Sequence, residues 1–195
     1  MNNLWMIRSD ADRYRSFAKK KPITGQKFIS LVDIFRSGEP IGERWEPIEL
    51  GLFPGEEGKE AQEQVRPIPD FTRGVVVYAI SAKARSILEP LIADQVEFLL
   101  LKTDVGLFYD MNIKRVDCLD VSRSVVIRFK SSGRVMDIEK YAFLWERIEG
   151  IHIFCIPELG ATPIFVSDAF KKTVEENHLT GFVFMPVPLA MTEDK

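Results

Sequence analysis

The chain has 195 residues, of which 46% are hydrophobic and 28% charged, a balance typical of a globular protein with a buried core. A net charge of −3 and a pI near 5.6 argue against a dedicated nucleic-acid-binding surface, which is normally basic. The N-terminus lacks the apolar region of a signal peptide, and no stretch reaches the roughly 20 apolar residues of a membrane span, so we expect a cytoplasmic protein without membrane contact.

The first third of the chain gives few signals of regular structure. An apolar run over residues 4–7 predicts a first strand, and several basic residues follow it. A basic cluster of this kind is typical of a solvated face, with a phosphate-binding patch as the alternative. Alternating apolar and polar residues over positions 45–53 then predict a half-buried strand.

Residues 54–70 (PGEEGKEAQEQVRPIPD) are rich in Pro, Gly and Glu and contain almost no core residues. This composition predicts a linker or a long surface loop. It would separate an N-terminal α/β part, residues 1–53, from a C-terminal domain, residues 71–195, and so allows two subdomains. Its FPGEEGKE stretch is not a Walker phosphate loop, because Phe53 and Glu60 stand where that loop requires Gly and Ser or Thr.

Beyond residue 70 the apolar pattern is denser. GVVVYAIS predicts a buried strand, and Ser81 at its end is a suitable N-cap for an amphipathic helix that Pro90 should kink or restart. The apolar face of this helix consists of Ala84, Ile87, Leu88, Leu91 and Ile92. Further strands are predicted at VEFLLLK, LFYDMNI, VDCLD, SVVIRFK, IHIFCIP and PIFVS. These elements predict an α+β fold, with a mainly antiparallel sheet and a few amphipathic helices.

The segment IFVSDAFKKTVEENHLTGFVF, near the C-terminus, predicts a strand–helix–strand unit. Ser167 is a suitable N-cap, and Phe170 and Val174 lie one turn apart on the inner face of the helix. The helix should end near His178, one of the non-glycine residues that best tolerate a positive φ. Gly181 then permits a tight entry into the last strand.

The residues that carry most enzymatic chemistry are scarce. Cys118, Cys155, His152 and His178 lack the spacing of a metal site, and the apolar context of both cysteines predicts buried thiols in preference to a disulfide. No Gly-x-Ser-x-Gly nucleophile motif occurs. His152 alternates with isoleucines in a predicted strand, so we expect it to face outward or to make one structural hydrogen bond. We therefore expect no catalytic residue, no metal and no cofactor.

Carboxylates are the remaining candidates for chemistry. Asp104, Asp110, Asp117 and Asp120 lie close together in the sequence and could serve a metal or a general acid in a small-molecule enzyme. On a strand, however, Asp117 and Asp120 would point to opposite faces. Solvated turn residues are the preferred interpretation, because charged side chains are mostly exposed.

The C-terminal segment resembles the closing signature of a family of bacterial immunity proteins from polymorphic toxin systems, typified by a myxobacterial immunity protein. The shared pattern is an IFVS strand, a helix with FK and VE, then LTG and an aromatic strand. PDFTRGVVVYAISAKARSILEPLIADQVEFLLLK and YDMNIKRVDCLDVSRS are similar to two further segments of that family. The resemblance spans about residues 68 to 187, and His178 stands where the family pattern has glycine.

This resemblance implies a non-enzymatic protein that binds one cognate toxin one-to-one and blocks its active site or substrate entrance. Some members are associated with nuclease toxins that bacteria deliver by contact-dependent secretion, such as type VI secretion. A nuclease cleft would be basic, so acidic residues in loops and at strand ends are the candidate contacts. They are Glu56, Glu57, Glu60, Glu63, Asp104 and Asp110. A solvated linker, a small-molecule enzyme and a regulatory binding module are the alternatives.

Overall fold

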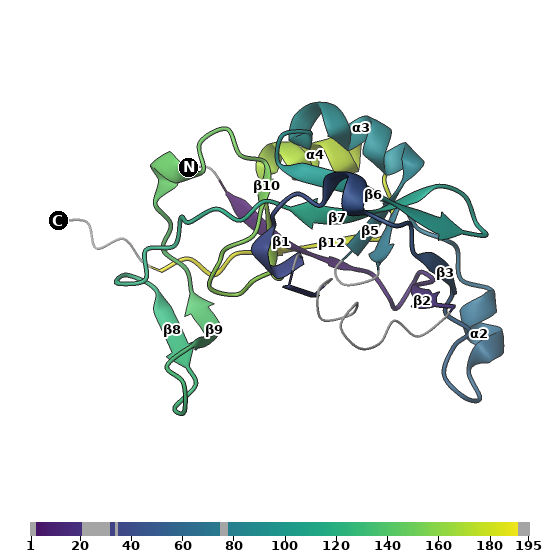
Figure 1. The fold of residues 1–195 in the computed structure, drawn as a ribbon, viewed down its shortest axis with the longest axis horizontal. Helices are drawn as coiled ribbons and strands as arrows, with labels where there is room; N and C mark the ends of the chain where they lie inside the picture. The colour runs from purple at the N-terminus through teal and green to yellow at the C-terminus, as the bar shows by residue number, and fades with distance from the viewer. Residues whose placement is uncertain (1–2, 21–31, 34, 75–77, 191–195) are drawn as a thin grey trace.

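The computed structural model describes residues 3–20, 32–33, 35–74 and 78–190. In these ranges the strands form a four-stranded, a six-stranded and a two-stranded sheet, and most of the pairings are antiparallel. The predicted α+β fold is confirmed. Figure 1 shows the two larger sheets forming the body of the molecule, with helices covering one side.

The four-stranded sheet joins the two ends of the chain. Its order is β10 (Ile153–Phe154), β11 (Ile164–Ser167), β1 (Leu4–Ser9) and β12 (Phe182–Pro186), and every neighbouring pair is antiparallel. The apolar run at residues 4–7 is therefore a strand, as predicted, and it lies between two C-terminal strands.

The six-stranded sheet has the order β2 (Phe17–Lys19), β3 (Glu49–Leu52), β6 (Val96–Thr103), β7 (Phe108–Ile113), β5 (Tyr78–Ser81) and β4 (Phe71–Arg73). β3 and β6 pair in parallel. We expected the segment 54–70 to divide the chain. Strands from before and after this segment nevertheless pair with each other: β3 with β6, and β1 with β11 and β12. That segment is mostly exposed, but it is not irregular throughout, because it contains α2 (Glu60–Gln64).

Two amphipathic helices, α3 (Ala82–Ile92) and α4 (Asp168–Glu176), pack side by side over the sheets (Figure 1). Both predicted caps are present: Ser81 Oγ accepts the amide of Ala84 at 3.1 Å, and Ser167 Oγ accepts that of Phe170 at 3.2 Å. We expected Pro90 to kink or restart α3; the helix does not restart there, because it is continuous from Ala82 to Ile92. The expected apolar positions of both helices face the core.

The predicted end of α4 is confirmed in its backbone. His178 has φ 49°, and Gly181 has φ 89°. A Cβ on Gly181 would lie 2.1 Å from the carbonyl oxygen of Phe71 in β4, so glycine is required by both conformation and space. The amide of Phe71 donates to the carbonyl of Thr180 at 3.0 Å. This junction ties the four-stranded sheet to the six-stranded sheet.

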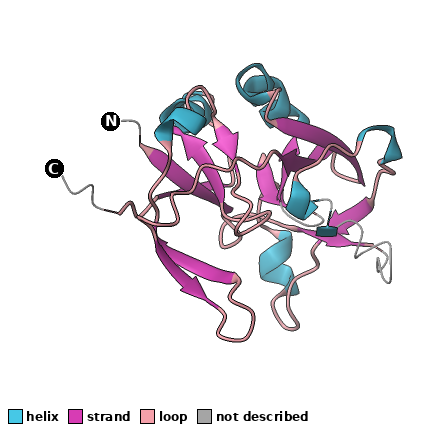
Figure 2. Cartoon of the chain, turned by 60° about the vertical axis from the view of Figure 1, so that its left-hand side comes forward, coloured by secondary structure: helices cyan, strands magenta, loops and turns pink. Residues whose placement is uncertain are grey.

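The buried residues form a larger cluster beneath α3 and α4 and a smaller, aromatic one around Tyr141, Phe143, Phe154 and Phe165. The hairpin β8 (Val125–Arg128) and β9 (Val135–Lys140) projects from the body beside the smaller cluster, as Figure 1 and, from a second direction, Figure 2 show. Short 3-10 helices occur at η1 (Gly42–Arg44) and η2 (Trp145–Arg147). The prediction of a strand at VDCLD, residues 116–120, was wrong. The chain turns directly after it, and within the segment only Leu119 forms a β-bridge, with Phe143.

Candidate functional site

Four of the six predicted contact residues lie on the surface at one end of the six-stranded sheet, and we name Glu56, Glu57, Glu60 and Asp104 the acidic edge. The glutamates follow β3, and Asp104 follows β6. Because β3 and β6 are parallel neighbours, both strands end at the same edge of the sheet. β3 and α2 lie at the right of Figure 1.

Half of the acidic edge is ion-paired within the chain. Lys59 Nζ lies 2.6 Å from Glu56, and hydrogen bonding to this ammonium holds the pKa of the Glu56 carboxyl below its usual value. Lys20 Nζ lies 2.7 Å from Asp104, whose hydrogen bond raises the pKa of the lysine. Glu57 and Glu60 make no ion pair with any residue that the structure describes.

The other two predicted contacts are not on this surface. Glu63 is only 7% exposed and is bound by Arg66 at 2.7 Å. Asp110 is fully buried in the middle of β7, between β5 and β6. We expected it beside a strand end, and that expectation was wrong, because the strand extends through it to Ile113. A Cβ on Gly74 would collide with its carboxylate, so the absence of a side chain there makes room for Asp110.

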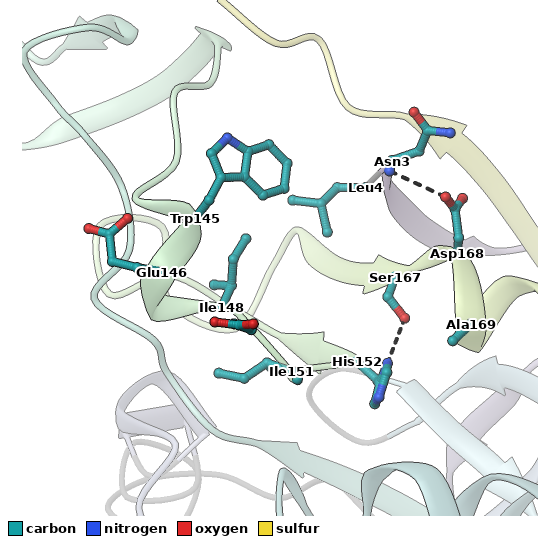
Figure 3. Close-up of a pocket in the computed structure, with 12 residues that line it drawn as sticks. Asn3, Leu4, Trp145, Glu146, Ile148, Ile151, His152, Ser167, Asp168 and Ala169 are labelled. Carbon is teal, nitrogen blue, oxygen red and sulfur yellow. Dashed lines mark hydrogen bonds between the residues drawn. The ribbon is translucent and has the colours of Figure 1, made fainter. Parts of the chain in front are cut away.

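A cavity lies elsewhere on the molecule, and we name it the Trp145 groove. It has a volume of about 520 Å³, within the ~300–1,000 Å³ typical of ligand pockets. η2 and the residues after it form one wall, and the start of β1, the end of β11 and the first turn of α4 form the other (Figure 3). Its lining combines apolar residues (Leu4, Trp145, Ile148, Ile151 and Ala169) with polar ones (Asn3, Glu146, Glu149, His152, Ser167 and Asp168).

Hydrogen bonds fix the wall formed by β1, β11 and α4, and one of them joins it to His152 on the η2 side. His152 Nδ1 lies 2.9 Å from Ser167 Oγ, as the dashed line in Figure 3 shows. This confirms the structural hydrogen bond expected for the histidine. Asp168 accepts from the indole nitrogen of Trp5 at 2.7 Å and from the amide of Asn3 at 3.2 Å. Its carboxylate is therefore occupied within the fold.

The η2 wall carries two carboxylates without an ion pair to any described residue. Glu146 and Glu149 are exposed, and neither makes an ion pair within the described ranges of the chain. Arg147, between them, is engaged elsewhere, because its Nη1 lies 2.7 Å from the carboxylate of Asp117. In Figure 3 Glu146 points to the outer side of η2, whereas the ring of Trp145 faces Leu4 across the groove. Trp145 is 40% exposed, so part of its large apolar surface is open to solvent.

The remaining candidates for chemistry are dispersed. Asp117 pairs with Arg147, while Asp120 accepts from the hydroxyl of Ser122 at 2.6 Å and so closes its own turn. Burial raises the pKa of both Cys118 and Cys155 to about 12, and both are free thiols. Within the described part of the chain no three His, Cys, Asp or Glu side chains gather in a way that could hold a metal ion.

The groove could not be predicted from the sequence. Its lining comes from segments about 140 residues apart along the chain, which meet because β1 pairs with β11. The local signal was present in WERIEG, where two glutamates, Glu146 and Glu149, follow a tryptophan within four residues. Only the fold distinguishes that stretch from a solvated turn.

Comparison with known proteins gives one assignment. No curated protein matches the chain. In the described ranges no helix is long and apolar enough to cross a membrane. The Immunity protein family (Imm11) matches residues 52–188, more than two thirds of the chain, and the match includes the acidic edge and all of the groove except Asn3 and Leu4. The match encloses residues 68 to 187, where the sequence resembles this family. Immunity proteins of this kind are typically non-enzymatic, so the family confirms our expectation that the protein is not an enzyme. The chain therefore belongs to the Imm11 family of immunity proteins, whose role is to neutralise a toxin.

Proposed function

We propose that the protein binds one cognate toxin domain one-to-one in the cytoplasm and covers the toxin's active site or substrate entrance. The observation that carries this proposal is the family match over residues 52–188. We further propose that the toxin is a secreted nuclease delivered between bacteria, because the exposed charge of the acidic edge suits a basic, nucleic-acid-binding cleft.

The ion pairs on the acidic edge do not prevent this role. Glu56 and Lys59 are both exposed, and water screens such a pair, so a basic partner can replace the lysine at little cost. Glu57 and Glu60 need no such exchange, because no described residue pairs with them. The edge also lies on a loop and a short helix, where side chains can serve a partner without disturbing the core.

The test is co-expression of the protein with the toxin domain encoded by the neighbouring gene. Wild-type protein should restore growth, and a catalytically inactive toxin domain should co-purify with it in equal amounts. Growth arrest despite folded protein, together with no complex between the purified proteins, would contradict the proposal. A regulatory module would instead bind several unrelated proteins weakly, which the same purification would reveal.

A further inference from the structure

We infer that the Trp145 groove receives an arginine side chain of the cognate toxin. The inference rests on the proposed function for the identity of the partner, but the chemistry of the site comes from the groove itself. It would add a specificity pocket to the electrostatic attraction of the acidic edge.

The first argument is charge complementarity. Glu149 lines the groove and is exposed, and it forms no ion pair with any described residue. The neighbouring cation that could have neutralised it, Arg147, is held by the side chain and carbonyl of Asp117, at 2.7 and 2.6 Å. A cation from outside is therefore the complementary partner for the Glu149 carboxylate.

The second argument is the apolar lining beside that carboxylate. Leu4, Ile148 and Ile151 line the groove, and they match the methylene stem that arginine and lysine bury while the charged head stays near polar groups. Trp145 offers a partly exposed indole ring, the best aromatic partner for a cation. Arginine is preferred to lysine because a planar guanidinium can stack on the ring and bind the carboxylate through two donors.

The N-terminus of α4 lies at the same groove and would by itself favour an anion. Here it is already satisfied. Ser167 Oγ accepts the amide of Phe170, and the carboxylate of Asp168 supplies negative charge in the first turn. The negative charge of Asp168 therefore disfavours an anion at this end of the groove.

The experiment uses the tryptophan side chains as reporters in the full ¹⁵N-labelled chain, titrated with N-acetylarginine methylamide and, in parallel, with its neutral citrulline counterpart. The indole N–H of Trp145 should shift in a saturable manner with the arginine compound only. Trp45 is the internal control, because its indole donates to the carbonyl of Leu100, away from the groove. In Glu149→Gln the affinity for the arginine compound, obtained from this shift, should fall by about tenfold.

A second arm uses the inactive toxin domain and distinguishes the two proposals. Glu149→Gln and Trp145→Ala should each weaken toxin binding by about tenfold, while Glu43→Gln, an exposed glutamate on η1, should leave the affinity unchanged. If wild-type protein fails to bind the toxin, the proposed function fails, whereas the arginine titration still reports on the groove. Equal shifts with arginine and citrulline, or unchanged toxin affinity in both groove variants, would overturn the inference.

Discussion

The acidic edge and the Trp145 groove differ in how their charges are used. Three of the four carboxylates of the edge come from the glutamate-rich segment 54–70, yet Lys59 and Lys20 pair with two of the four. In the groove, by contrast, Glu149 makes no ion pair with any described residue, and it lines the same cavity as the exposed Trp145. A count of charges in a sequence therefore overstates the charge open to a partner when the fold pairs them locally, and it cannot detect a groove that assembles from distant segments.

The acidic edge and the groove also lie on different sheets, which meet at the junction between Gly181 and Phe71. We expect the largest effect on the stability of the fold from a substitution at this junction. Gly181→Val should lower the free energy of unfolding by about 3 kcal/mol, because the new side chain would meet Phe71 and adopt a strained positive φ. Chemical denaturation measures this loss.

Gly133→Val is the matched control for that variant. Gly133 also has a positive φ, of 67°, but nothing lies within 4 Å of its Cβ position. It should therefore report the backbone strain alone and destabilise the protein less. Equal losses in the two variants would show that the contact with Phe71 is unimportant.

The division of roles between edge and groove should appear in binding kinetics. The double variant Glu57→Lys/Glu60→Lys should slow association with the toxin by about tenfold at low salt and weaken the salt dependence of that rate. Glu149→Gln should act mainly by speeding dissociation, because it removes a short-range contact. Stopped-flow measurements at two salt concentrations separate these effects. Unchanged association in the edge variant would place the steering charge elsewhere.

The local architecture of the groove can be tested with two similar caps. Ser167→Ala removes both the N-cap of α4 and the partner of His152, whereas Ser81→Ala removes the cap of α3 without changing any residue that lines the groove. Each should cost about 1 kcal/mol of stability. Only Ser167→Ala should also weaken toxin binding, and equal binding by both variants would argue against the groove as a contact.

The smallest expected effect is a pH dependence at Asp70, which ends the segment 54–70 and binds the loop before β12. Burial would raise the pKa of Asp70, but hydrogen bonds from Thr180 and Ser81 outweigh it and hold the pKa below its ordinary value. Because the folded pKa lies below the unfolded value of about 3.9, this stabilisation is present above about pH 4 and is lost as the pH falls through the folded pKa.

Asp70→Asn should therefore show a shallower loss of unfolding free energy between about pH 5 and pH 3 than the wild-type protein. Denaturant titrations at these pH values provide the comparison. Identical pH profiles would mean that Asp70 does not contribute to acid sensitivity.

The sequence predicted those features that local physics determines. Ser81 and Ser167 cap helices, His178 accepts a positive φ, and Gly181 occupies a position that only glycine can fill. It could not place β1 between β11 and β12, because strand pairing across the whole chain leaves no local pattern. The burial of Asp110 and the assembly of the groove were missed for the same reason: both depend on which strands become neighbours.

Toxin neutralisation can be measured as inhibition of the purified toxin domain by increasing amounts of this protein. If the protein covers the active site or its entrance in the tight one-to-one complex that we propose, toxin activity should fall linearly and reach zero at a molar ratio of one. Full toxin activity in the presence of excess folded protein would contradict the account.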